Sequence, residues 1–405
     1  MTLSANERAI VAAMGSRSAA IRADLAELVA MPTGHGCAKG LERARSWMGA
    51  RLSAIGATLS RRPGGARPDW LREGPVGADA CETLIASSVR QAGLRVLVSG
   101  HLDTVHDPNA AFRELVAVGD GSLRGPGAID MKGGLVVALH ALEAVAAANA
   151  SGPWSMVLNA DEETGSFRSE LTLQELAKEH DIGLVMEPAY GAGDFVTGRA
   201  GSVQFRVDAY GREAHAGRDA ASGVSAVGPL CAAVTRLLSH SDPASGRTLN
   251  VGPLEGGAAT NIVPGHAAAW GNARYRTQTQ RDELDALLKS VELGGDSDLP
   301  RLRVRVVHNR PTKPATAEVE AIAAVARSAA GDLGLTVGCA TSGGVSDANT
   351  MQAAGLPCLD GLGPRGGNMH RTDEFVIEAS LVERASVMAL LLTRLWGRGS
   401  VPWAP

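Results

Sequence analysis

Short apolar runs alternate with segments of helical periodicity along most of this chain, and this alternation constrains the fold more than any other feature. The apolar runs are at 95–99, 154–160 and 184–186, and the helical segments are at 132–148 and 171–180. Strands that are joined through helices lie parallel in a sheet, with the helices on its faces. The pattern therefore predicts an α/β fold with a mostly parallel sheet flanked by helices. Two further helices are expected before it, the second from Gly40 to Leu59.

This alternation is interrupted after Thr197 by segments of a different kind. There apolar and polar residues alternate, as they do in a strand with one face in solvent. The segments that follow have the order βαββαβ, which is that of a split, ferredoxin-like sandwich. From Glu318 the first pattern resumes. We therefore expect one α/β domain from residues 1–196 and 311–405, and an inserted α+β domain at 197–310.

Composition excludes several classes of protein. With 405 residues, 45% of them hydrophobic, the chain can bury a large core. A net charge of -4 without long blocks of one sign argues against nucleic acid as a partner. No stretch is apolar for long enough to cross a membrane, and the N-terminus lacks the apolar core of a signal peptide. The five cysteines are an odd number without a CxxC pair, which suits reduced thiols, so we expect a cytoplasmic protein.

Two motifs place metal-binding side chains at the ends of predicted elements. His101, in GHLDTV (100–105), follows the apolar run at 95–99, and Asp103 is near enough to orient its ring. Such strand ends face the crevice of an α/β sheet. Asp130 lies before a helix in GPGAIDMKGG (125–134), which has more glycines than a helix cap needs. Taken singly, these residues are also compatible with a loop histidine and a helix cap.

Residues in three further motifs complete a ligand set. Glu162 and Glu163 follow an apolar strand in NADEETGS (159–166), Glu187 ends another apolar run, and His370 lies in a glycine-rich loop. Consecutive side chains in extended backbone diverge, so one of the two adjacent glutamates can bind metal while the other faces the reacting water. Two histidines and three carboxylates suit two zinc ions bridged by one carboxylate. Cobalt or manganese would also fit this set of ligands.

The motifs resemble those of the M20 family of metallopeptidases, and their residue sequences are most similar to those of bacterial glutamate carboxypeptidases. In family order, they are GHLDTV, GPGAIDMKGG, NADEETGS, MEP, GREAHAG, TNIVPG, TSGGVSDA and MHRTDE. The resemblance implies a dinuclear zinc hydrolase that cleaves an amide bond next to a free carboxylate. Met131 and Asn272 stand where many relatives carry an acid. Neither is a ligand, so catalysis is still expected, and these departures leave the exact substrate open.

The resemblance also implies a role for each residue of the centre. The first zinc ion would be held by His101, Asp130 and Glu187, and the second by Asp130, Glu163 and His370. Glu162 would be the general base, and Asp103 would orient His101. The peptide bond between Asp130 and Met131 would be cis.

The inserted domain, by the same resemblance, would be a lid and dimerisation domain of a homodimer. His215 would reach into the partner's active site and stabilise the oxyanion. Four positions resemble groups that bind the substrate's carboxylate, either through side chains or through backbone donors: Asn261, Arg310, Gly343 and Gly344. Arginine suits this role because its planar fork binds both carboxylate oxygens.

The sequence bears on three alternatives to a carboxypeptidase. An N-acyl-amino-acid deacylase uses the same zinc pair and differs only in the acyl group, so the sequence does not separate the two. A binding protein on an inactive hydrolase fold would be expected to lack a metal ligand or the general base. In this sequence all five expected ligands and the expected base are present. An oxidoreductase on a doubly wound sheet requires a glycine fingerprint that the chain lacks.

Overall fold

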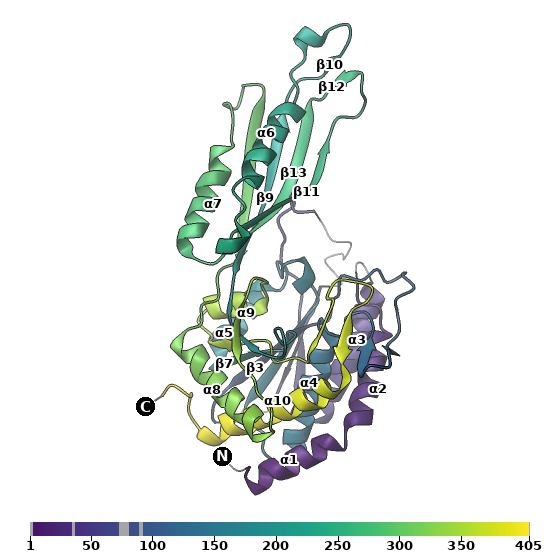
Figure 1. Ribbon diagram of the computed structural model, residues 1–405, viewed down its shortest axis with the longest axis vertical. Helices are drawn as coiled ribbons and strands as arrows, with labels where there is room; N and C mark the ends of the chain where they lie inside the picture. Colours follow the sequence, from purple (N-terminus) through teal and green to yellow (C-terminus); the bar gives the residue numbers. More distant parts are fainter. Residues whose placement is uncertain (1–2, 35–36, 73–80, 89–91, 405) are drawn as a thin grey trace.

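The molecule consists of two bodies, a larger one that contains both ends of the chain and a smaller one built around a separate sheet (Figure 1). The computed structural model describes residues 3–34, 37–72, 81–88 and 92–404. A six-stranded sheet of the order β1-β2-β6-β3-β7-β16 runs through the larger body. Its strands are β1 (Thr58–Arg62), β2 (Thr83–Ser87), β6 (Trp154–Asn159), β3 (Val96–His101), β7 (Ile182–Val185) and β16 (Cys358–Leu359).

Alternate side chains of the central strands pack on opposite faces of this sheet. Val96 and Val98 of β3 belong to the main core, whereas Leu97 belongs to a second cluster on the other face. The helices of the main core are α1 (Ala5–Gly15), α2 (Ser18–Val29), α3 (Ala38–Ala54), α4 (Lys132–Ala147), α8 (Ala317–Asp332) and α10 (Glu378–Arg398). The other face is covered by α5 (Glu170–Glu179) and α9 (Asp347–Ala353). The expected α/β sheet between helices is confirmed. None of the helices in the described residues is long and apolar enough to cross a bilayer.

The sheet is mixed, and its antiparallel edge was not predicted. The neighbours β6, β3, β7 and β16 are parallel, as expected, but β1 and β2 are antiparallel to their neighbours. The helix that was expected to reach Leu59 ends at Ala54, because Gly56 adopts the left-handed conformation (φ +88°) and stops it. All five residues of β1 are exposed, so this strand lacks the apolar signal of a buried one.

Two small sheets connect the larger body to the loops of the site. One is a parallel pair of β8 (Phe195–Arg199) and β15 (Cys339–Ser342). The other has the order β17-β18-β5-β4, with β17 (Gly366–Gly367), β18 (Phe375–Ile377), β5 (Ser122–Arg124) and β4 (Val116–Ala117). The pairing of β18 with β5 brings the loop that contains His370 beside the turn that contains Asp130, although the two are far apart in the sequence.

The smaller body, which we call the insertion unit (201–310), is an antiparallel sheet with two helices. Its strands are β9 (Gly201–Tyr210), β11 (Thr248–Gly256), β13 (His266–Tyr275) and β14 (Arg301–Arg310), in the order β11-β13-β9-β14. The helices α6 (Val227–Leu238) and α7 (Gln278–Ser290) pack on the core of this sheet. A short pair, β10 (Ala214–His215) with β12 (Ile262–Val263), lies at the end of the unit remote from the larger body (Figure 1).

Two chain segments join the insertion unit to the larger body and run side by side. The backbone N–H of Arg199 donates to the carbonyl of Lys313 at 2.8 Å, and the reverse bond is 3.0 Å long. The amide of Asn349, at the start of α9, donates to the carbonyls of Ala200 (2.8 Å) and Pro311 (2.7 Å). The side chain of Asn349 in the larger body thus binds both connecting segments. We call these segments, at 199–200 and 311–313, the hinge segments.

A second contact between the two bodies forms through the segment before residue 73. The indole N–H of Trp270, on β13, donates to the carbonyl of Trp70 at 2.7 Å. Two guanidinium groups also lie over the Trp270 ring, that of Arg72 at 5.2 Å and that of Arg206 at 4.6 Å from its centroid. The space between the bodies is therefore bounded on one side by the hinge segments and on the other by this aromatic contact.

Candidate metal centre and active site

The five predicted metal ligands come together at one edge of the six-stranded sheet. His101 ends β3, Glu187 follows β7, and Glu163 lies in the short helix η2 (Glu162–Thr164) after β6. The strands β6, β3 and β7 are parallel neighbours, so their carboxyl ends meet at this edge. Asp130 enters from the turn before α4 and His370 from the connection between β17 and β18.

Asp130 lies at the centre of this group. Its Oδ1 is 3.2 Å from Nε2 of His101, and its Oδ2 is 3.4 Å from Nε2 of His370. Nε2 of His101 is 3.8 Å from Oε1 of Glu187, and Nε2 of His370 is 3.3 Å from Oε2 of Glu163. The side chains form two sets, His101 with Asp130 and Glu187, and Asp130 with Glu163 and His370, whose ligand atoms lie within 4.8 Å of one another. The structure thus brings the five expected ligands together in the two sets that the resemblance implies.

The electrostatics of the cluster favour a cation. Burial raises the pKa of Glu187 well above its usual value, and the neighbouring charge of Asp130 raises it further. Burial also raises the pKa of Glu163. In contrast, the pKa of Asp130 is held below its usual range, because hydrogen bonds from His101 and His370 outweigh its burial. Without a metal ion the cluster must hold protons to balance its acids, and bound cations would replace those protons.

The donor atoms fit a pair of divalent metal ions. Each set contains one imidazole and two carboxylates, a combination that zinc binds well. Oε1 of Glu163 is buried and has no hydrogen-bond partner among the described residues, which leaves it available as a ligand. When bound, such ions polarise a substrate carbonyl and lower the pKa of water.

The turn that contains Asp130 is held by a residue that was not predicted to act here. The peptide bond between Asp130 and Met131 is cis, as predicted. The carboxylate of Glu374 is buried and accepts hydrogen bonds from the backbone N–H groups of Gly127 (3.2 Å), Ile129 (2.9 Å) and Asp130 (3.1 Å). Glu374 lies four residues after His370, within the MHRTDE motif, and its place in that motif was the signal that could have identified it.

Asp103 makes two kinds of contact. Nδ1 of His101 lies 2.9 Å from its backbone carbonyl and 3.5 Å from its Oδ1, which fits the predicted role in orienting that ring. The same carboxylate accepts the backbone N–H of Glu162 (3.3 Å) and of Glu163 (3.0 Å). Asp103 therefore also fixes the backbone of the loop that contains the expected base.

Glu162 lies beside the ligand sets without belonging to either. Its Oε1 accepts a hydrogen bond from Nη2 of Arg310 at 2.9 Å. Burial raises the pKa of Glu162 to about 7, although the charge of Arg310 opposes that rise. A carboxyl group with a pKa near neutrality can both accept and release a proton, as a general base requires.

A cavity of about 860 Å³ opens above the cluster, between the two bodies. Its lining includes Asp130, Glu162, Glu163, Glu187 and His370. The lining also includes arginines that were not predicted from the sequence, among them Arg199 and Arg274. Nη1 of Arg274 is buried without a hydrogen-bond partner among the described residues. Arg274 lies on β13 between the core residues Ala273 and Tyr275, so its side chain is on the other face of the sheet, which lines the cavity.

The other predicted site residues are divided between the cavity and the far end of the insertion unit. Arg310 and Gly344 line the cavity, and Gly343 lies beside Gly344. His215 and Asn261 are exposed and lie near the β10–β12 pair, at the far end of the insertion unit (Figure 1). Neither of these two lines the cavity of its own chain.

Comparison with known proteins gives consistent matches over most of the chain. The family model for the peptidase family M20/M25/M40 matches residues 97–394. Carboxypeptidase G2 of Pseudomonas sp. (strain RS-16) is 28% identical over 93% of this chain and 89% of its own. A succinyl-diaminopimelate desuccinylase of Alkalilimnicola ehrlichii is 30% identical over 80% of this chain and 91% of its own.

The fold is also similar to solved structures. That of a tripeptidase from Staphylococcus aureus superposes with a TM-score of 0.73 and 23% identity, over 94% of this chain and 99% of the other. This likeness supports the fold, whereas the sequence match supports the family. The protein is thus a metal-dependent hydrolase, and the chain belongs to the peptidase family M20/M25/M40.

Proposed function

We propose that this hydrolase cleaves an amide bond next to a free carboxylate, as a carboxypeptidase of the glutamate type, with two zinc ions per chain. The observation that carries the proposal is the pair of candidate ligand sets that share Asp130, on a cavity whose lining also includes arginines. Cobalt or manganese can take the place of zinc with these ligands. All five cysteines are free in the structure, which supports a cytoplasmic location.

In this proposal Glu162 is the general base. It takes a proton from the attacking water and passes it to the leaving nitrogen. Its neighbour Glu163 instead belongs to the candidate ligand set with Asp130 and His370. The division between two adjacent glutamates follows from their geometry, because Glu162 instead contacts Arg310.

Arg274 is the strongest candidate among the cavity residues to bind a carboxylate of the substrate. Its guanidinium is largely buried, its Nη1 lacks a protein partner in the described structure, and a carboxylate would supply one. Arg310 is already engaged, because its side chain is 1% exposed and contacts Glu162 and Asp347. The predicted contribution of Arg310, Gly343, Gly344 and Asn261 to carboxylate binding stays a proposal beside that of Arg274.

We also propose that the protein is a homodimer that pairs through the insertion unit, which acts as a lid. His215 and Asn261 lie at the remote end of this unit, so they can serve an active site only if that site belongs to another chain or if the unit moves. The edge strand β11 leaves Leu254 exposed, and Ile262 is exposed nearby. An open strand edge with apolar side chains is suited to pairing with a second copy.

The main alternative is an N-acyl-amino-acid deacylase of the same family, and the similarity to a desuccinylase supports it. A panel of substrates separates the two proposals. Protein loaded with zinc or cobalt is incubated with N-aroyl-glutamates, glutamyl dipeptides, N-acetyl amino acids and N-succinyl amino acids, and the released amino acid is quantified. Preferential release of glutamate from aroyl or peptidyl substrates supports the carboxypeptidase. Preference for acetyl or succinyl substrates supports the deacylase, and the absence of any hydrolysis contradicts both.

A further inference from the structure

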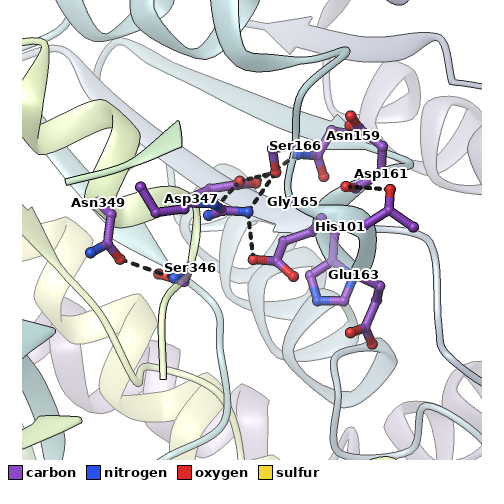
Figure 2. Close-up of polar contacts among 12 residues, drawn as sticks. His101, Asn159, Asp161, Glu163, Gly165, Ser166, Ser346, Asp347 and Asn349 are labelled. Carbon is purple, nitrogen blue, oxygen red and sulfur yellow. Dashed lines mark hydrogen bonds and ion pairs between the residues drawn. The ribbon is translucent and has the colours of Figure 1, made fainter. Parts of the chain in front are cut away.

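Asp347, the first residue of α9, lies next to the guanidinium of Arg310. Its Oδ1 is 3.2 Å from Nη1 of Arg310, an ion pair without hydrogen-bond geometry. Ser166 joins the two groups, since its hydroxyl donates to Oδ1 of Asp347 at 2.5 Å and lies 2.8 Å from Nη2 of Arg310. The amide of Asn159 donates to Oδ2 of Asp347 at 2.7 Å. Figure 2 shows Asp347, Ser166 and Asn159 converging on one place beside His101 and Glu163.

This cluster is buried and therefore rigidly defined. Arg310, Asp347, Ser166 and Asn159 are each 2% exposed or less. A buried guanidinium needs charge compensation and directed hydrogen bonds, because leaving it unpaired is costly. Arg310 obtains its compensation from two carboxylates, Asp347 on one side and Glu162 on the other.

The start of α9 also holds the hinge segments. Asn349, two residues after Asp347, donates to the carbonyls of Ala200 and Pro311. Pro311 directly follows Arg310 in the chain. The same short segment therefore fixes both the backbone that follows Arg310 and the guanidinium of Arg310 itself, and Figure 2 shows Asn349 and Ser346 on that segment.

We propose that Asp347 is a positioning residue of the reaction, which acts through Arg310 on the general base Glu162. Asp347 holds the guanidinium of Arg310 in place and balances part of its positive charge. Arg310 can then orient Glu162 while Glu162 is not its only counterion. This inference rests on the proposed function, in which Glu162 is the base. It assigns a role in turnover to a residue that contacts neither the metal ligands nor the open part of the cavity.

The test is the Asp347→Asn variant, which keeps the size of the side chain and removes its charge. With the substrate selected from the panel, we expect kcat to fall about tenfold, which corresponds to about 1.4 kcal/mol, and KM to stay within about twofold, since groups in one hydrogen-bond network are energetically coupled. In a Glu162→Ala background the same substitution should cause no further loss, because its effect passes through Glu162. A purely structural role would lower kcat equally in both backgrounds.

Asp208→Asn is the matched control. Asp208 is also a buried carboxylate paired with an arginine, at 2.9 Å from Arg305, but it lies in the insertion unit away from the cavity. Its neutralisation should lower the thermal midpoint without changing kcat. Metal content is measured for every variant, and about two equivalents per chain are expected throughout.

A second variant keeps the inference testable if Asp347→Asn fails to fold. Ser166→Ala removes only the hydroxyl that joins Asp347 to Arg310, and it should lower kcat by a few-fold in the parent and not in the Glu162→Ala background. The inference is overturned if kcat is unchanged in the folded variants, if only KM changes, or if the losses are equal in both backgrounds. If the parent hydrolyses no substrate, or if Glu162→Ala turns over like the parent, the proposed function itself has failed.

Discussion

Nη2 of Arg310 lies 2.9 Å from Oε1 of Glu162, so the last residue of β14 in the insertion unit directly contacts the expected general base. Arg310 therefore connects the position of the insertion unit with the chemistry of the larger body. Lids that close over a substrate complete a catalytic site in this way in many enzymes. A change in the hinge segments, which adjoin Arg310, would be transmitted to Glu162 through one side chain.

The first prediction concerns Glu162 itself. Replacing it with alanine should lower kcat by about 10²- to 10⁴-fold, the usual contribution of a general base. Metal content should remain at about two equivalents per chain, because Glu162 belongs to neither ligand set. The matched variant is Glu163→Ala, which should lose metal as well as activity. Activity within a few-fold of the parent would remove Glu162 from the mechanism.

The second prediction concerns Arg274. Its replacement with alanine should raise KM for a substrate with a free carboxylate by about 10-fold or more, since a charge-assisted bond to a charged group is worth about 1.5–3 kcal/mol. Its effect on kcat should be smaller, because Arg274 contacts no residue of the ligand sets in the described structure. Steady-state kinetics with a carboxylate substrate and its amide analogue provide the measurement. An equal KM increase for both substrates would show that Arg274 does not bind the carboxylate.

The third prediction concerns the stability of the metal-free protein. Burial raises the pKa of Glu162 to about 7 and that of Glu187 well above its usual value, while hydrogen bonds that His370 donates to Asp130 and Glu163 raise the pKa of His370 to about 10. The folded chain thus holds protons on these groups that the unfolded chain has released. Its free energy of unfolding should therefore fall as the pH rises from about 6 to about 7. Above that range Lys132 and Lys313, whose pKa values burial lowers to about 7 and about 8, have the opposite effect.

Thermal midpoints of chelator-treated protein at about pH 6 and about pH 7 test this. The control is the same protein reloaded with zinc, whose midpoint should fall less, because bound cations take the place of the protons and metal binding strengthens with pH. A midpoint of the metal-free protein that rises with pH would contradict the charge balance described for the cluster.

The fourth prediction concerns His215 and the dimer. A His215→Ala chain and a Glu162→Ala chain should each be nearly inactive, and a mixture of the two should recover activity. In a mixed dimer one site has the intact Glu162 of the first chain and the intact His215 of the second. The recovery should follow the fraction of mixed dimer, which is measured with differently tagged chains.

Two controls define this experiment. Exchange of subunits must be demonstrated, and a mixture of Glu162→Ala with a Glu162→Ala, His215→Ala chain should stay inactive. If proven mixed dimers show no recovery, His215 acts within its own chain or takes no part in the reaction.

Much of the order of the elements, and the side chains that meet in the candidate metal cluster, could be predicted from the sequence. The ligands His101, Asp130, Glu163, Glu187 and His370 each lie in a short motif next to a strand end or a turn, and these are local features. The exposed strand β1 was missed, because it carries no apolar alternation. The buried strand β2, which pairs antiparallel with β6, was also not predicted, so the mixed character of the sheet was missed.

What only the tertiary structure decided is how the buried charges are paired. Arg310 and Glu162 are 148 positions apart, and Ser166 and Asp347 are 181 apart, so no local pattern relates them. Periodicity and turn chemistry act over a few residues and therefore determined the strands, the helices and the ligand motifs from the sequence alone. The partner of a buried guanidinium is whichever carboxylate the packed chain brings within reach. A buried guanidinium must be paired because leaving its charge unpaired is costly, and the tertiary structure determines which carboxylate is its partner.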